Sequence, residues 1–326
     1  MKLQVFTWLR GYDRSWIRGD VIAGLTFWAV LVPEALAYAT IAGVSPVVGL
    51  YAAPGALLLY AAFGSSRQLG VGPTAATAAL SAAAVGDLAG QNTDMFVQLT
   101  ITMALTVGIA ALIAGLLRLG FLASFISEPV MKGFIIGLSL TIMVGQLPKL
   151  LGVEKREGDF FEQLWHLLGE LGSTSGLTLV VGVAALVVVL GLKRVAPALP
   201  SSLLAVLGGI VAVHLFHLDK HGVAIVGNIE SGLPSFGLPD VGLSDYLDLA
   251  PAAVGAMLIG FAEGLGAAKT YAAQNNYKID ANRELLGVGV GNIGAGLSSG
   301  MVVGGSLSKT AVNAGAGAKS QLSSRG

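Results

Sequence analysis

An isolated glutamate in a long apolar stretch is the first residue whose chemistry needs an explanation. Glu34 lies within residues 21–43, which hold no other charged side chain. A carboxylate at the centre of a membrane-spanning helix costs about 3 kcal/mol, so it is expected to face a cavity. Because desolvation favours its protonated form, such a group can take up and release a proton near neutral pH. Glu34 is therefore predicted to bind a substrate and to carry a coupled proton; the alternative is a carboxyl group that only holds helices together.

Two segments rich in small residues, 71–86 and 303–318, are too short to cross a membrane alone. A helix that begins in mid-membrane leaves its first N–H groups without partners and points the positive end of its dipole into the space before it. Two such helix starts that face each other would bind an anion. The predicted substrate contacts are Gly72, Pro73, Thr74 and Ala75 in the first segment, and Ser306, Leu307, Ser308 and Lys309 in the second.

Some of these residues have specific expected roles. Pro73 suits the first turn of a helix because it has no N–H to leave unpaired. Thr74 adds a hydroxyl donor, and Lys309, in the first turn of its segment, adds a positive charge inside the membrane. The alternative for this lysine is a side chain that extends to the membrane interface. A further acid, Glu263, has two readings, a coupling residue or a structural partner for Lys269.

The two glutamates belong to an internal repeat. Residues 31–39 and 260–268 each hold a glutamate followed by a small residue, a leucine and another small residue. The distance from this glutamate to the hydroxyl residue of the following short segment is 40 residues in the first copy and 43 in the second. Seven predicted crossings separate the copies, so the second enters the membrane from the opposite side. Short interrupted segments at matching positions of inverted halves mark the midplane site of a transporter; the alternative is a chance match between strings rich in alanine and glycine.

The elements that would position these residues are apolar blocks. The chain has 326 residues, 54% of them hydrophobic and 12% charged, with a mean hydropathy of +0.76. A soluble domain carries about 25% charged residues, so this composition predicts an all-α polytopic membrane protein. Since a crossing needs about 20 apolar residues, ten membrane segments are predicted, the two short ones included. The other eight are residues 21–43, 47–63, 97–117, 121–147, 177–192, 199–218, 251–272 and 284–301.

Several classes of function are excluded. The chain has no cysteine, which rules out disulfide scaffolds, thiolate metal sites and cysteine nucleophiles. Its net charge is zero, so it has no overall positive charge to attract nucleic acid. A glycine pattern at residues 289–294 matches a dinucleotide fingerprint, but packing of membrane helices explains it better. No enzyme activity, cofactor or metal ion is expected.

Basic residues set the predicted orientation. Twelve lysines and arginines fall on one side of the predicted spans and four on the other, while acids gather in the loops 148–176 and 219–250. By the positive-inside rule the N-terminus is cytoplasmic. Residues 1–19 mix aromatic and basic side chains and are predicted to lie on the inner membrane surface.

The motifs resemble those of the SulP sulfate-permease family over essentially the whole chain. They are RGDVIAGLT (18–26), PEALAYA (33–39), GLYA (49–52), FGSSRQLGVGP (63–73), EGLGAAKTYA (263–272), YKIDANREL (277–285) and GSLSKTAVN (305–313). This resemblance implies a seven-plus-seven inverted-repeat transporter fold with a core and a gate domain, elevator-like movement, and a substrate site between the first, third, eighth and tenth spans. Glu34, Thr74 and the pair Ser308 and Lys309 resemble the family's substrate contacts.

The resemblance also implies a division of the chain. Residues 20–250 would form the first repeat with spans 1–7, and residues 251–326 an incomplete second repeat with spans 8–10. Family members continue with four more spans and usually a STAS domain. The chain is therefore expected to be inactive alone, and the full-length parent to form a homodimer.

The predicted function is secondary active transport of a small inorganic anion across the bacterial inner membrane. Family substrates are sulfate, bicarbonate, chloride, oxalate and dicarboxylates, and the glutamate at position 34 resembles the proton-coupled bacterial branch. Sulfate with a proton is the first expectation. The alternatives are sodium-coupled bicarbonate transport and an uncoupled, channel-like anion protein.

Overall fold

The computed structural model describes residues 5–9, 12–90, 92–124, 128–154, 160–196, 199–227 and 232–325. This part of the chain is mostly helical and has two strands of three residues. The chain divides into two compact units, the first of residues 1–126 and 230–326 and the second of residues 127–229. All the predicted site residues lie in the first unit. The units do not follow the two predicted repeats, so the repeat boundaries stay a prediction.

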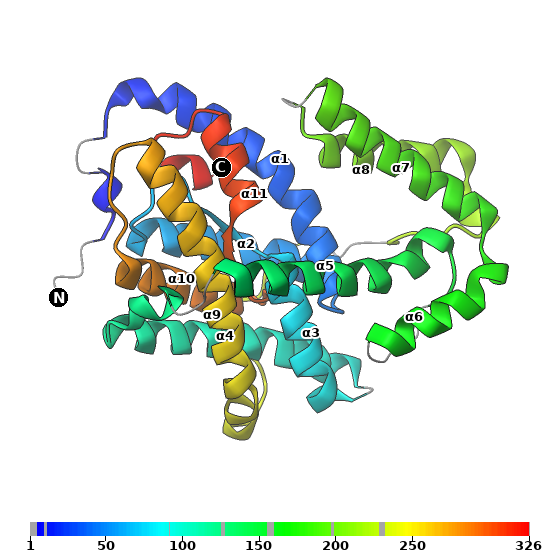
Figure 1. Ribbon diagram of the computed structural model, residues 1–326, viewed down its shortest axis with the longest axis horizontal. Helices are drawn as coiled ribbons and strands as arrows, with labels where there is room; N and C mark the ends of the chain where they lie inside the picture. Colours follow the sequence, from blue (N-terminus) through cyan, green and yellow to red (C-terminus); the bar gives the residue numbers. More distant parts are fainter. Residues whose placement is uncertain are drawn as a thin grey trace. The chain divides into compact units, whose positions relative to one another are not determined.

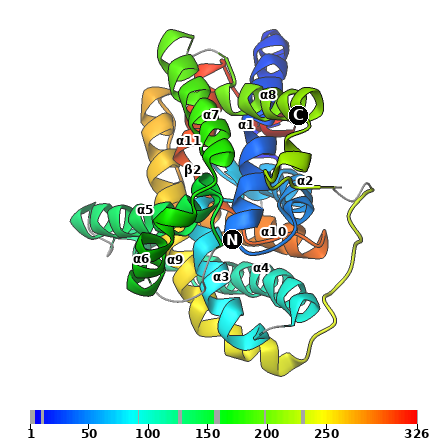
Figure 2. The same cartoon turned by 90° about the vertical axis from the view of Figure 1, so that its right-hand side faces the viewer.

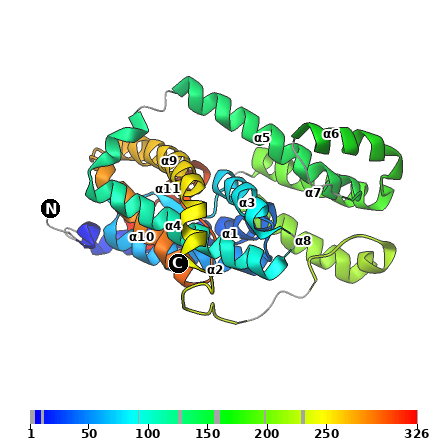
Figure 3. The same ribbon diagram turned by 90° about the horizontal axis from the view of Figure 1, so that it is seen from below.

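Seven α-helices build the described part of the first unit. They are α1 (Ile17–Ile41), α2 (Pro46–Phe63), α3 (Ala75–Ala89), α4 (Thr93–Leu116), α9 (Leu243–Gln274), α10 (Ala281–Leu297) and α11 (Leu307–Gly315) (Figure 1). Polar side chains fix several of the helix starts: Asn92 accepts from the backbone of Met95 before α4, and Asp280 accepts from two N–H groups before α10. Viewed from below, α3 lies among α1, α4 and α9, which it contacts (Figure 3).

Helix α10 packs between α2 and α4 at very short range. A Cβ atom added at Gly294 would lie 2.6 Å from the backbone oxygen of Gly55 on α2. One added at Gly289 would lie 3.0 Å from the backbone nitrogen of Leu112 on α4. Small residues permit such close approach of membrane helices. The pattern at residues 289–294 is therefore a packing surface, as the sequence indicated, and not a dinucleotide site.

Two short strands bring the starts of α3 and α11 together. β1 (Gly70–Gly72) pairs antiparallel with β2 (Gly304–Ser306), with Val71 opposite Gly305. α11 begins directly after β2, and α3 begins after Pro73 and Thr74, which follow β1. Because the strands are antiparallel, α11 and α3 extend in opposite directions, upward and downward from β2 in Figure 2. The predicted pair of short helices that begin beside each other is confirmed. Their bounds differ, since residues 71–74 and 303–306, at the start of the two predicted segments, lie before the helices.

The N-terminal segment is tied to the end of α2. The indole N–H of Trp8 donates to the Ala61 carbonyl oxygen at 2.7 Å, and the Phe6 N–H donates to Ala62 at the same distance. Phe6, Trp8, Tyr12 and Trp16 follow one another in edge-to-face ring contacts. The predicted interfacial segment is thus held to the protein and does not depend on lipid alone.

The second unit consists of α5 (Glu128–Leu151), α6 (Phe160–Gly169), α7 (Gly176–Val195) and α8 (Ser201–Phe216). α5 contacts α6 and α7, and α7 contacts α8. The most apolar window of α7 contains no buried residue, as expected of a surface that faces lipid. The helix α6 lies where the sequence predicted a loop, because its ten residues are too few to give a membrane-span signal.

Six of the described helices are long and apolar enough to cross a membrane. They are Arg14–Ile41, Pro46–Phe63, Thr93–Leu116, Lys132–Leu151, Gly176–Val195 and Leu243–Gln274. Each of the other predicted segments contains a shorter helix. The predicted crossing at 121–147 is wrong in its start, because Leu119–Ser124 form a separate 3-10 turn. α9 begins at Leu243, before the predicted start of the second repeat at residue 251.

Candidate functional site

The start of α3 is closed by a capping box. Thr74 is the N-cap, and its hydroxyl oxygen accepts from the Thr77 N–H, while the Thr77 hydroxyl oxygen accepts from the Thr74 N–H, both at 3.3 Å. Pro73 precedes the cap, so the prediction that it stands in the first helical turn is wrong. The reason is that extended backbone continues through β1 to Thr74, and the side chain of Thr74 caps α3. Gly72, Pro73 and Thr74 are buried, and Ala75 is half-buried.

The start of α11 carries hydroxyl groups and a lysine. Ser306 is the N-cap, and its hydroxyl oxygen accepts from the Lys309 N–H at 3.4 Å. The hydroxyl oxygens of Ser306 and Ser308 lie 3.0 Å apart. Leu307 and Ser308 are exposed, whereas Lys309 is buried in the first turn, as predicted. The two caps take up one N–H at each helix start, and both positive dipole ends lie next to the paired strands.

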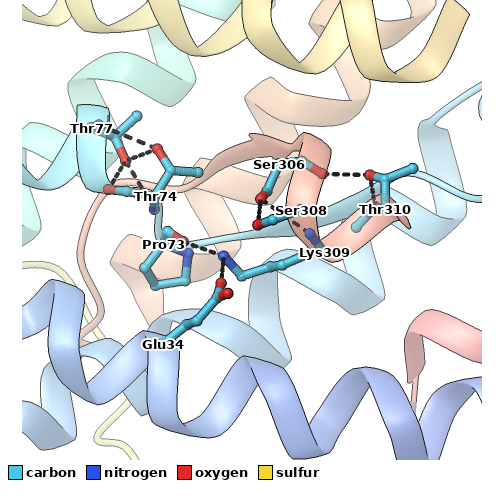
Figure 4. A network of polar contacts seen from close by, with 9 residues as sticks. Glu34, Pro73, Thr74, Thr77, Ser306, Ser308, Lys309 and Thr310 are labelled. Carbon is cyan, nitrogen blue, oxygen red and sulfur yellow. Dashed lines mark hydrogen bonds and ion pairs between the residues drawn. The ribbon is translucent and has the colours of Figure 1, made fainter. Parts of the chain in front are cut away.

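Lys309 forms an ion pair with Glu34, which the sequence reasoning did not foresee. The Lys309 Nζ lies 2.7 Å from the Glu34 Oε2 and donates to the Pro73 carbonyl oxygen at 2.8 Å (Figure 4). It also lies 4.9 Å from the centre of the Tyr38 ring. The lysine side chain is 1% exposed and the glutamate 21%. The sequence indicated a separate role for each of these two residues, but in the structure their charges neutralise each other.

Tyr38 is a site residue that sequence reasoning missed. It stands four residues after Glu34 on α1, a spacing that puts both side chains on one face of a helix. Its ring covers the Lys309 ammonium group, and such cation–π contacts contribute about 1 kcal/mol or more where water is excluded. In the sequence, the spacing of four residues between Glu34 and Tyr38 could have identified Tyr38.

Glu263 does not pair with Lys269. Among the described residues the two form no ion pair within 4 Å, since residues six apart lie on different faces of α9. The structural role proposed for Glu263 through Lys269 is therefore wrong. α9 itself runs close to β2, where a Cβ atom at Gly264 would lie 3.1 Å from the Cα of Gly305. α9 also contacts α11, so Glu263 is carried by an element that borders the site.

Asn292 of α10 supports the strand that precedes α11. Its side-chain oxygen accepts from the Val303 N–H at 3.0 Å, and its amide N–H donates to the Val303 carbonyl oxygen at 2.9 Å. Asn292 is completely buried. The residue holds the chain directly before β2 and so fixes where α11 begins. In the sequence, an asparagine within a glycine-rich apolar segment could have identified this residue.

The site offers no evident place for a metal ion. Among the described residues no three histidine, aspartate or glutamate side chains form a group that could hold one. The arrangement consists of two helix starts, one ammonium group and one carboxylate. Positive groups of this kind bind small anions by charge and by N–H donation.

Sequence comparison identifies relatives. The model of the sulfate permease family matches residues 17–324. A probable sulfate transporter of Mycobacterium tuberculosis is 40% identical over 313 residues, which are 96% of this chain and 56% of that protein. The chloroplastic sulfate transporter 4.1 of Arabidopsis thaliana is 35% identical over 328 residues, 98% of this chain and 47% of that protein. The chain spans about half the length of the curated relatives it matches.

Structure comparison finds the same fold in solved proteins. The overall structure of SLC26A9 has a TM-score of 0.91 at 23% identity, covering 98% of this chain and 54% of that one. The transmembrane domain of a cyanobacterium bicarbonate transporter, BicA, has a TM-score of 0.84 at 25% identity, covering 96% of this chain and 81% of that one.

Proposed function

The chain belongs to the sulfate permease family, and from this premise we propose that it forms the anion site of a proton-coupled sulfate transporter. Members of this family are membrane transporters of anions and not enzymes. The curated relatives named above are sulfate transporters, which supports sulfate as the substrate. The observation that carries the coupling is the 2.7 Å ion pair between Glu34 and Lys309 beside two helix starts.

Protonation of Glu34 changes the charge of the site by one unit. With the carboxylate ionised, the ammonium group of Lys309 is neutralised, and an incoming anion competes with a carboxylate already in place. With Glu34 protonated, the ammonium group and both helix dipoles are left without a counter-charge. An anion then binds more tightly.

This competition couples the two ions thermodynamically. If protonation of Glu34 strengthens anion binding, a bound anion must favour protonation of Glu34 by the same factor. The proton and the anion therefore enter and leave together. Movement of the loaded site across the membrane by an elevator-like shift, with the second compact unit contributing to the gate, completes the proposed cycle.

Equilibrium binding tests the proposal without requiring a complete transporter. Labelled sulfate is titrated against the purified chain at pH 6 and pH 8, with unlabelled bicarbonate and chloride as competitors. We expect tighter binding at pH 6, equal binding at both pH values for Glu34→Gln, and weak binding at both for Lys309→Gln. Glu170→Gln is the control, because it removes a half-buried acid that lies in the second unit and outside the site. An unchanged pH dependence in Glu34→Gln would remove this residue from the coupling role.

Uptake into proteoliposomes separates the proposal from its alternatives. An imposed pH gradient, acidic outside, should drive sulfate above its equilibrium concentration if a proton is coupled. A channel-like protein allows equilibration only. Accumulation of bicarbonate under a sodium gradient, with no response to pH, would favour the alternative to which the similarity with BicA points.

A further inference from the structure

A basic cavity lies at the end of α2 and shares no lining residue with the Glu34–Lys309 site. Its volume is about 270 Å³. Three separate segments form its walls: Trp8 of the N-terminal segment, residues 64–67 of the loop after α2, and Tyr277, Lys278, Asp280 and Arg283 of the loop before and at the start of α10. Segments distant in the sequence thus converge on one space.

Three cationic side chains face this cavity, Arg67, Lys278 and Arg283. The Arg67 guanidinium lies over the Tyr277 ring at 5.1 Å, and the Arg283 Nε–H donates to the Phe63 carbonyl oxygen at 3.2 Å. These contacts orient both guanidinium groups. Within the described residues, Arg67 and Lys278 form no ion pair with a carboxylate.

The two carboxylates near the cavity, Asp280 and Glu284, already accept hydrogen bonds from the protein itself. Asp280 accepts from the N–H groups of Asn282 and Arg283 as the cap of α10. Glu284, 1% exposed, accepts four hydrogen bonds of 2.6 to 2.9 Å from the Tyr60 hydroxyl, the Ser65 N–H and hydroxyl, and the Ser66 N–H. In the described part of the chain, neither carboxylate forms an ion pair with Arg67 or Lys278. Arg67 and Lys278 therefore remain available to an external anion.

We propose that this cavity binds a phosphate group, such as the one in an anionic phospholipid headgroup. The guanidinium group of Arg67 can bind two phosphate oxygens at once, and Lys278 adds a further charge. The cavity lies beside the aromatic series that begins at Phe6, of the residue types that gather at membrane interfaces. It also lies on the side where basic residues predict the cytoplasmic leaflet, which carries anionic lipid. This inference does not depend on which anion the protein transports.

Thermal unfolding of the purified 326-residue chain in detergent tests the proposal. Short-chain phosphatidylglycerol, phosphatidylcholine and inorganic phosphate are each titrated against the chain and against Arg67→Gln and Lys278→Gln. We expect saturable stabilisation by phosphatidylglycerol and none by phosphatidylcholine. In each variant the apparent affinity should fall about five-fold, the equivalent of about 1 kcal/mol for one charge.

The control is Lys269→Gln, which removes one exposed charge from α9 outside the cavity and should bind as the parent does. Lys278 is also exposed, so its substitution preserves the fold even where that of Arg67 does not. Stabilisation by inorganic phosphate that competes with phosphatidylglycerol identifies the phosphate as the recognised part. Stabilisation by the lipid alone shows that the headgroup is needed as well. Equal effects of both lipids, or unchanged affinity in Arg67→Gln and Lys278→Gln, would overturn the proposal.

Discussion

Lys309 and Glu34 each depend on the other for their burial. A lysine that is 1% exposed is tolerated because a carboxylate lies 2.7 Å away and the Pro73 carbonyl oxygen accepts a hydrogen bond from its ammonium group. Removal of one partner leaves a buried charge without compensation, which costs about 3 to 5 kcal/mol in other proteins. The same pair that makes the site chemically useful thus also stabilises the contact between α1 and α11.

A double-mutant cycle measures this dependence. Glu34→Gln and Lys309→Met should each lower the free energy of unfolding. The loss should be near ~3 kcal/mol for Glu34→Gln, because it leaves the 1% exposed Lys309 without a counter-charge, and smaller for Lys309→Met, because the glutamate left behind is 21% exposed. The double variant should recover at least 1 kcal/mol of the summed loss. Unfolding of the purified chain in mixed micelles supplies the values. Strict additivity would mean that the two side chains do not interact energetically.

At the scale of elements, the start of α11 depends on α10 through Asn292. Replacement of this residue by leucine leaves the buried N–H and carbonyl groups of Val303 without their partners. Each such loss costs about 1 to 3 kcal/mol. We expect Asn292→Leu to lower the unfolding midpoint and also to weaken sulfate binding, because β2 and the cap of α11 shift. Asn275→Leu, on the exposed end of α9, is the control. Unaltered sulfate affinity in a folded Asn292→Leu would limit this residue to stability.

The close contact between α2 and α10 depends on a glycine on each helix, Gly55 and Gly294. Gly294→Ala would place a methyl group 2.6 Å from the Gly55 carbonyl oxygen, so the helices must separate. Overpacking of this kind costs about 1 to 3 kcal/mol. The matched control is Gly86→Ala on α3, where nothing lies within 4 Å of the added methyl group. Thermal unfolding should show a loss for Gly294→Ala and none for Gly86→Ala; equal midpoints would show that the helices adapt without strain.

For the whole molecule, orientation in the membrane follows from the distribution of charge. The chain has no cysteine, so a single introduced thiol reports its own location. Ser15 and Lys220 are both exposed and are predicted to lie on opposite sides, cytoplasmic and external. A membrane-impermeant maleimide should label Lys220→Cys in intact cells and should label Ser15→Cys only after permeabilisation. The reverse pattern would invert the topology.

Local composition alone determined much of this protein. The lengths of the apolar blocks predicted its membrane helices, and short blocks opened by glycine, proline and serine predicted α3 and α11. The chain's charges are few, so Glu34 and Lys309 stood out as site residues. The extended residues before each helix were missed, because pairing between β1 and β2 overrides the helical preference of their neighbours.

The partnership of those site residues was decided by tertiary structure. Glu34 and Lys309 are 275 residues apart in the chain, and hydropathy is a property of neighbouring residues only. Their contact requires that an antiparallel strand pair set the start of α11 and that Asn292 hold β2 in place. The basic cavity likewise needs three distant segments to meet. Distances between such segments depend on how closely helices pack, which no pattern along the chain records.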